Sequence, residues 1–340
     1  MLTKRVNRSC GACDSGVREQ AMRILSLTLL ALFFAGCGPA VSEAYRKTAQ
    51  YRYEVGEDAF ESGNYLEAVT HYSRVKTKFP YSKFAALAEL RIGDAYFEQD
   101  KFVEAIDVYQ TFVRRRPKHP KLAYAYWRIA EGYFEQMPAD FFLFPPSFER
   151  DRIYTKDALA AYVQYLSRFP DGQYAKNAGA KRKFCRTKLG DYELYVARFY
   201  LKNERPMSAM GRLETVHERF RDIPGHWEEG SLELLNVYRL LSQPDSSGEI
   251  RLLDAMERAR GVAQTLIDNK PGSKAASQAT RYMAALNRGD DPEAVEVYKA
   301  KPMPKPPRFK VTKKLKEAAE DIKESAKEAV LDELDNTKKN

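Results

Sequence analysis

The chain has 340 residues and a formal net charge of +9 at pH 7, from 56 Lys and Arg against 47 Asp and Glu. This mildly basic balance does not require a nucleic-acid partner, and we expect none. Only 18 glycines occur. Alanine, leucine, glutamate and lysine, which favour helix, are plentiful, so the composition predicts an all-α fold.

An apolar run from Ile24 to Ala35 follows Arg18 and Arg23 near the N-terminus. At about 12 residues it is too short for a transmembrane helix, which needs roughly 20, but it suits the hydrophobic region of a signal peptide. The run leads into Phe-Ala-Gly-Cys, ending at Cys37. This sequence resembles the lipobox of bacterial lipoproteins.

The lipobox resemblance implies that Cys37 is lipidated and that residues 1–36 are removed as a signal peptide. Residues 37–45 would then link the lipid anchor to the folded chain. Gly38, where an inner-membrane lipoprotein usually has Asp, favours the outer membrane. We expect translation to start at Met22, which would open a complete signal peptide. The alternative is an ordinary cleaved signal with a chance cysteine.

Removal of residues 1–36 would lower Lys and Arg from 56 to 51 and Asp and Glu from 47 to 45, which leaves a net charge near +6. Cys10 and Cys13 would leave with the signal peptide, and they lack the further ligands that a zinc site needs. With Cys37 lipidated, Cys185 would be the one free thiol. No disulfide is then expected.

Internal repeats occupy the region 46–288. A small residue, two larger apolar residues and a terminal proline recur at spacings of 4, 3 and 5 residues. The clear sets are Ala68, Tyr72, Val75, Pro80; Ala105, Tyr109, Phe112, Pro117; and Ala158, Tyr162, Tyr165, Pro170. A weaker set follows at Ala209, Leu213 and Val216, with Arg221 in place of the proline, and the last set is Ala259, Ala263, Leu266, Pro271. These spacings put the apolar residues on one helical face, and the proline ends the helix.

The pattern resembles the tetratricopeptide repeat, a helix pair of about 34 residues. We therefore predict an all-α solenoid of about five tetratricopeptide-like helix pairs at 46–288. A proline-rich spacer at 289–309 should be extended. A charged tail at 310–340 favours helix, either solvated or docked on a partner.

The third repeat is interrupted by an insertion around residues 137–152, which adds 16 residues between its two helices. Three prolines exclude a regular helix there. Its large apolar side chains are costly to expose, so they form either a plug against neighbouring helices or a partner-docking loop. They are Phe141, Phe142, Leu143, Phe144 and Phe148.

No motif of a nucleotide-binding loop, a serine hydrolase or a zinc protease occurs in the chain. The histidines are scattered, at His71, His119, His217 and His226. We therefore predict a protein that is not an enzyme and that needs no cofactor or metal. The alternative is an enzyme whose carboxylates come together from distant repeats.

A ligand-binding groove is predicted on the first helices of the first three repeats. In tetratricopeptide arrays these helices line the concave surface. Equivalent positions hold a bulky apolar residue, an acid and a phenylalanine, which suits an extended segment with aromatic and cationic side chains. They are Tyr53, Glu57, Phe60, Leu90, Asp94, Phe97, Trp127, Glu131 and Phe134. The alternative is that the phenylalanines pack between repeats.

The lipobox, the repeats, the interrupted third repeat and the segments "SRFPDGQYA" and "ELYVARFY" closely resemble the BamD family. These are lipoprotein subunits of the machinery that inserts β-barrel proteins into the outer membrane. The resemblance covers roughly residues 30–288. It implies a lipid-anchored protein in the outer membrane of a Gram-negative bacterium, facing the periplasm.

The family resemblance also implies partners. The N-terminal repeats would receive unfolded outer-membrane β-barrel precursors, and the C-terminal repeats would dock the periplasmic domain of BamA. Arg212 matches a family arginine at that docking surface, and a guanidinium can form bidentate pairs with carboxylates there. Other assembly lipoproteins are further partners that the family implies.

Two other functions remain open at this level. One is a periplasmic tetratricopeptide scaffold that coordinates envelope constriction or peptidoglycan synthesis. Such proteins usually lack a lipobox or carry a coiled coil before the repeats. The other is a peptidoglycan-modifying enzyme on a helical superhelix, but a catalytic domain should then follow the array.

Overall fold

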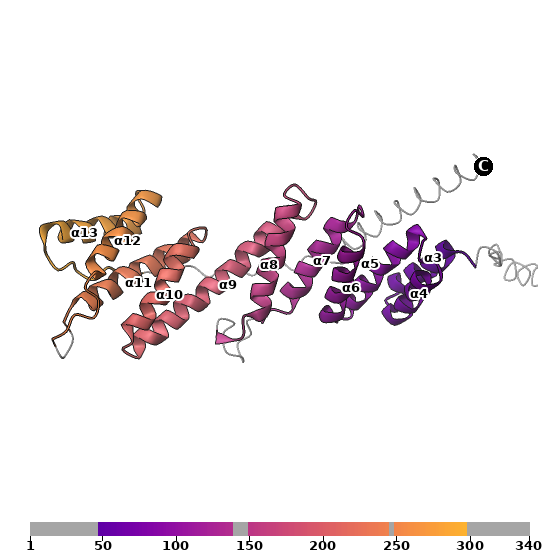
Figure 1. Ribbon diagram of the computed structural model, residues 1–340, viewed down its shortest axis with the longest axis horizontal. Coiled ribbons are helices and arrows are strands. Elements are labelled where there is room, and N and C mark those ends of the chain that lie inside the picture. The colour runs from indigo at the N-terminus through magenta and orange to yellow at the C-terminus, as the bar shows by residue number, and fades with distance from the viewer. Residues whose placement is uncertain (1–46, 139–148, 245–247, 298–340) are drawn as a thin grey trace, which may run out of the picture.

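The computed structural model describes residues 47–138, 149–244 and 248–297, which form an elongated array of helices (Figure 1). The helices in these ranges are α3 (Ala49–Glu61), α4 (Tyr65–Lys78), α5 (Lys83–Glu98), α6 (Phe102–Arg115), α7 (Leu122–Glu135), α8 (Ile153–Arg168), α9 (Ala175–Lys202), α10 (Pro206–Arg219), α11 (Pro224–Ser242), α12 (Ala255–Asn269) and α13 (Lys274–Arg288). The described residues contain no β-strand, only an isolated bridge between Pro244 and Ile250.

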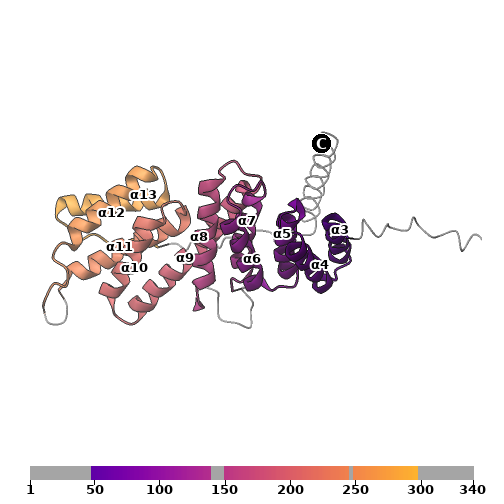
Figure 2. The ribbon, with the colours of Figure 1, turned by 45° about the vertical axis from the view of Figure 1, so that its right-hand side comes forward.

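Each helix packs against the next one along the chain, so that the array advances in one direction from α3 to α13 (Figures 1 and 2). Helices α3 to α12 form five consecutive pairs, and α13 covers the last pair. Most connections are short, but those between α7 and α8 and between α11 and α12 are longer. This arrangement confirms the predicted all-α solenoid of helix pairs.

The repeating pattern read from the sequence marks the inner face of the second helix in each pair. Its small residues are fully buried in all five pairs: Ala68, Ala105, Ala158, Ala209 and Ala259. The helices end two residues before Pro80, Pro117, Pro170 and Pro271. The first helix approaches closely at Gly56, where an added Cβ would lie 2.7 Å from the Tyr72 ring. The small residues therefore set the helix spacing within each repeat.

The described part of the spacer does not leave the array at residue 289. The Asn236 side chain of α11 accepts a hydrogen bond from the Val295 N–H at 2.8 Å and donates one to the Val295 carbonyl at 2.9 Å. Val295 and Val297 pack against the core of the last repeats. The packed region therefore continues to residue 297, because one side chain satisfies both backbone groups of Val295.

Several predicted segments lie outside the described residues. These are the signal peptide, Cys37 and its linker, the apolar side chains of the insertion, and residues 298–340. Helix α7 ends and α8 begins on either side of the insertion, at Glu135 and Ile153. Within the described ranges, no helix has the length and apolar character needed to cross a bilayer.

Candidate functional site

The structure places the predicted groove residues inside the array. Eight of the nine are buried, with at most 5% of their surface exposed, and Phe60 is half-buried. The prediction that these side chains face an open groove is therefore wrong. The first helix of each repeat lies between its own partner helix and the next repeat, so this face is covered. The residues concerned are Tyr53, Glu57, Leu90, Asp94, Phe97, Trp127, Glu131 and Phe134.

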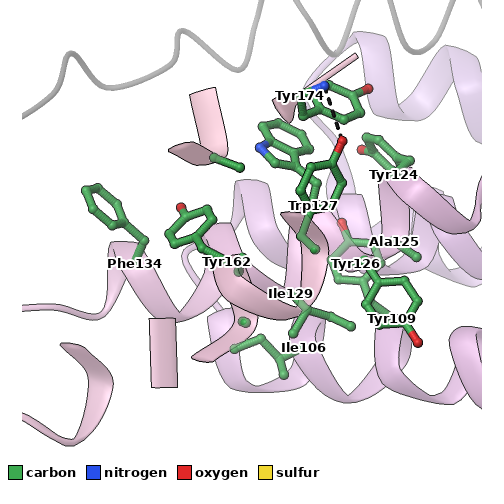
Figure 3. Packing of buried hydrophobic residues seen from close by; sticks show 14 of the residues in the cluster. Ile106, Tyr109, Tyr124, Ala125, Tyr126, Trp127, Ile129, Phe134, Tyr162 and Tyr174 are labelled. Atoms are coloured by element: carbon green, nitrogen blue, oxygen red, sulfur yellow. Dashed lines mark hydrogen bonds between the residues drawn. The ribbon is translucent and has the colours of Figure 1, made fainter. Parts of the chain in front are cut away.

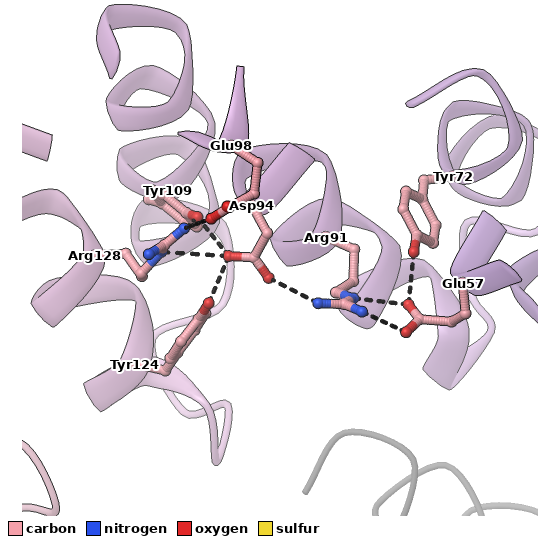
Figure 4. Close-up of polar contacts among 8 residues, drawn as sticks. All are labelled: Glu57, Tyr72, Arg91, Asp94, Glu98, Tyr109, Tyr124 and Arg128. Carbon is pink, nitrogen blue, oxygen red and sulfur yellow. Dashed lines mark hydrogen bonds and ion pairs between the residues drawn. The ribbon is translucent and has the colours of Figure 1, made fainter. Parts of the chain in front are cut away.

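The first buried acid, Glu57 of α3, binds side chains from two other helices (Figure 4). Arg91 of α5 donates from Nε to Oε1 at 2.7 Å and from Nη2 to Oε2 at 2.5 Å, a bidentate pair. Tyr72 of α4 donates its hydroxyl to Glu57 at 2.6 Å. The Arg91 guanidinium lies 4.2 Å from the centre of the Phe60 ring. Glu57 thus joins the first repeat to the second.

The second acid, Asp94 of α5, repeats the arrangement one unit further along. Tyr109 of α6 and Tyr124 of α7 each donate a hydroxyl to Asp94 Oδ1 at 2.5 Å. Arg128 of α7 lies 3.4 Å from the same oxygen, and Arg91 lies 3.5 Å from the other. The charges therefore alternate in a continuous buried row across α3, α5 and α7, as Figure 4 shows.

The third acid, Glu131 of α7, uses a lysine. Lys181 of α9 lies 2.5 Å from Oε2, and Tyr162 of α8 donates its hydroxyl to Oε1 at 2.8 Å. The Lys181 ammonium also lies 4.4 Å from the centre of the Phe134 ring. The three repeats thus share one unit, which we call the acid–tyrosine–cation triad: an acid, the tyrosine of its own repeat, and a cation of the next repeat.

The triads follow a constant spacing along the chain. In the first triad the tyrosine lies 15 residues and the cation 34 residues after the acid, and the tyrosine of the second triad again lies 15 residues after. In the third triad the separations are 31 and 50 residues. Both differ from the others by 16, the length of the insertion, so the insertion leaves the interface between repeats intact.

Burial and charge pairing compete in setting the pKa values of the triads. Burial raises the pKa of Glu57, but the Arg91 guanidinium and its hydrogen bonds outweigh burial and hold the pKa below its usual value. Burial, with Asp94 contributing, raises the pKa of Tyr109 well above its ordinary value. Glu57 is therefore ionised and internally neutralised at neutral pH, so its carboxylate is not available to a cationic ligand.

Two further groove residues, Trp127 and Phe134, take part in aromatic packing (Figure 3). Trp127 stacks on Tyr174 with ring centres 4.2 Å apart and planes within 9°. Phe134 meets Tyr162 edge-on, with ring centres 6.1 Å apart. These rings belong to the core formed by α5 to α9. The Phe134 ring also lies 5.8 Å, centre to centre, from the Phe184 ring of α9, so Phe134 packs between repeats, as the alternative prediction for the phenylalanines states.

Arg212 lies at the surface, in a group of charges that joins three helices. Its Nη1 donates to Glu193 of α9 at 3.1 Å, and Arg152, just before α8, reaches the same carboxylate at 3.3 Å. The Arg212 side chain is 39% exposed, while that of Glu193 is 14% exposed. Arg152 also lies 3.5 Å from the centre of the Tyr192 ring. Two arginines share one carboxylate, so the group carries a net positive charge.

No group of three or more His, Cys, Asp or Glu side chains that could hold a metal occurs in residues 47–138, 149–244 and 248–297. The sole free cysteine in these ranges, Cys185, is buried, and burial raises its pKa to about 12. The described residues thus offer internal links between repeats and exposed helix surfaces, as repeat proteins do.

This fold and these surfaces define a tetratricopeptide-like helical repeat protein. A family model described as outer membrane lipoprotein, YfiO, matches residues 45–252. The match covers more than half of the chain, and the protein belongs to this family.

Relatives named "Outer membrane protein assembly factor BamD" are similar to the chain. The one from Caulobacter vibrioides is 30% identical over 221 residues, which cover 63% of this chain and 68% of the relative. The one from Vibrio cholerae is 27% identical over 116 residues, 34% of this chain and 44% of the relative. The TPR2AB-domain:pHSP90 complex of yeast Sti1 aligns with 71% of this chain and 84% of its own at 12% identity. Its TM-score of 0.33 is too low to support an inference.

Proposed function

We propose that the protein is an outer membrane protein assembly factor, a lipoprotein that binds unfolded β-barrel precursors and docks the periplasmic domain of BamA. The observation that carries this proposal is the match of residues 45–252 to the outer membrane lipoprotein family, together with the similarity to BamD of Caulobacter vibrioides. The role is that of a scaffold without catalysis.

The lipid anchor is assigned to Cys37, in a lipobox-like sequence ten residues before Lys47, where the described structure begins. The description of the family as an outer membrane lipoprotein supports this assignment. The array would then hang from the inner leaflet of the outer membrane and face the periplasm. Mass spectrometry of the purified protein would detect the added mass on the N-terminal peptide.

Precursor binding is assigned to the N-terminal repeats, but to other side chains than the buried groove residues. The first and second repeats expose an apolar residue at the same position, Leu66 at 72% and Val103 at 65%. An exposed acid follows each of them, Glu67 and Glu104. An apolar side chain beside a carboxylate suits precursor segments with apolar and basic residues. The buried acid–tyrosine–cation triads fix the position of the first repeat relative to the second.

Docking of BamA is assigned to the charged group around Arg212. Because Glu193 already receives Arg152, the group has positive charge to spare for a carboxylate on a partner. A planar guanidinium can form two parallel hydrogen bonds with such a carboxylate. The exposed fraction of Arg212, 39%, leaves part of the guanidinium accessible.

The test is purification of tagged protein from its native membranes, followed by identification of the proteins that accompany it. We expect a β-barrel subunit in the wild-type sample and its loss in Arg212→Glu. The matched control is Arg258→Glu on α12, an arginine of similar exposure that is also paired with acids. Equal loss in both variants, or recovery of cell-wall proteins alone, would contradict the proposed docking.

A further inference from the structure

Two helix connections at the N-terminal end of the array carry only basic charge on their exposed side chains. Between residues 68 and 99 every exposed charged residue is Lys or Arg, and the same holds between 108 and 122. Tyr81 lies among them and is fully exposed, at 101%. We call these side chains the basic edge: Lys76, Lys78, Tyr81, Arg114, Arg115 and Lys118.

The two connections lie on the same side of the solenoid. One joins α4 to α5 and the other joins α6 to α7. Short connections make consecutive helices antiparallel, so alternate connections fall at the same edge. Arg116 in the second connection also donates to Glu89 of α5, the helix that follows the first connection, at 2.9 Å.

The chain also enters the array at this edge. Helices α3, α5 and α7 are the first helices of successive pairs and run in the same direction. Ala49, the first residue of α3, is therefore at the same edge as Lys83, which opens α5 directly after the first connection. The linker from Cys37 thus reaches the array beside the basic edge.

Helix dipoles alone do not account for this charge. Basic residues in the last turn of α4 and α6 complement the dipoles of those helices. Lys118 and Tyr81, however, lie in the connections themselves, beyond the helix ends. The later connections at this edge include exposed acids, Asp171 and Asp222, and Asp222 pairs with Arg186. The purely basic character belongs to the repeats nearest the anchor.

We propose that the basic edge rests against anionic phospholipid headgroups of the membrane that holds the Cys37 lipid. This inference relies on the proposed lipid anchor. Ten residues from Cys37 to Lys47 can extend at most about 35 Å, so the edge stays within reach of the headgroups. Tyrosine is favoured at the membrane–water interface, which suits the exposed ring of Tyr81.

The function of this contact is orientation rather than attachment. Each Lys or Arg near an anionic surface shifts the equilibrium toward contact by about fivefold. Neutralising four cations should therefore weaken the contact by more than about a hundredfold, although the acyl chains still hold the protein. With the basic edge on the bilayer, the opposite edge of the first two repeats points into the periplasm.

The test uses acylated full-length protein on vesicles of phosphatidylcholine with or without phosphatidylglycerol. A fluorescent thiol label is placed at Tyr81→Cys or, as matched control, at Lys101→Cys. These positions flank the two ends of α5, about 24 Å apart for its 16 residues. Cys185 is buried and Cys37 is blocked by its lipid, so the introduced thiol reacts. Neutral acrylamide then reports the access of each label to water.

On phosphatidylglycerol vesicles we expect the label at 81 to lose acrylamide quenching while the label at 101 keeps it. The protection should disappear on neutral vesicles, in high salt, and in the variant Lys76→Gln/Lys78→Gln/Arg115→Gln/Lys118→Gln. Equal quenching at both positions, or protection that survives neutralisation, would overturn the proposal. Labelling of Cys37 and failure to float with the vesicles would instead show that the anchor is absent.

Discussion

Replacing Arg91 by methionine removes the cation that lies between Glu57 and Asp94. The Arg91 side chain is 1% exposed, so the Glu57 carboxylate would remain buried without its cation, with the Tyr72 hydroxyl still donating to it. Removing one partner of a buried ion pair costs about 3–5 kcal/mol. Local opening of the first repeats should then become roughly two to four orders of magnitude more frequent.

The stability lost in Arg91→Met should depend on pH. In the wild-type protein the pKa of Glu57 is lowered, so its contribution to stability is complete above the unfolded pKa of about 4.3 and is lost as pH falls. In Arg91→Met, unopposed burial raises this pKa, and the penalty disappears once the carboxylate is protonated. The difference in the free energy of local unfolding between the wild-type protein and Arg91→Met should therefore shrink as pH falls toward 4.

Hydrogen exchange of the α3 and α5 amides measures this opening, since repeat arrays need not unfold in two states. The double variant Glu57→Gln/Arg91→Met should recover most of the loss, because no buried charge is left unpaired. Arg74→Met, at an exposed arginine of α4, is the control and should change stability by less than about 0.5 kcal/mol. A double variant as unstable as the single one, or a pH-independent difference, would refute the reasoning.

Three further predictions concern other parts of the array. In Gly93→Ala the added Cβ would lie 2.6 Å from the Tyr109 ring, so we expect a loss of about 1–3 kcal/mol in urea unfolding; an unchanged midpoint would contradict this. Burial, then a nearby arginine, lowers the pKa of His217 to about 4. The unfolded chain binds a proton between pH 6.5 and 4 that the folded state excludes, so stability decreases as the pH is lowered through this window. His217→Asn should flatten that slope, and parallel curves would argue against it. Asn236→Ala removes both hydrogen bonds to Val295, so exchange of that amide should accelerate while the α3 amides stay unchanged.

The repeat architecture could be predicted because it depends on local sequence patterns. Alanine, tyrosine and proline at spacings of 4, 3 and 5 report one buried helical face and one helix end, and both are local properties. Ala68 and Ala105 are buried as the pattern requires. Even the weaker set around Ala209 predicts its helix end, because α10 ends at Arg219, two residues before Arg221, which stands in the proline position.

The candidate site was misplaced because the decisive partners lie in the next repeat. Glu57 and Asp94 recur at one period and resemble a row of ligands when each repeat is considered alone. The sequence does contain a signal that these acids are paired inside the protein. Each is followed 34 residues later by an arginine, Arg91 after Glu57 and Arg128 after Asp94. For Glu131 the insertion hides that signal, since its partner Lys181 lies 50 residues away. Surface properties such as the exposure of Arg212 follow from packing, which the sequence pattern does not specify.

The third triad shows where this chain tolerates a change of length. Sixteen residues enter between α7 and α8, yet Glu131 meets its tyrosine and its cation as the uninterrupted repeats do. The connection between these helices is thus a position where sequence can be gained or lost without breaking the buried contacts that join the repeats. A recognition loop placed there could diverge freely while the geometry presented by the other repeats stays constant.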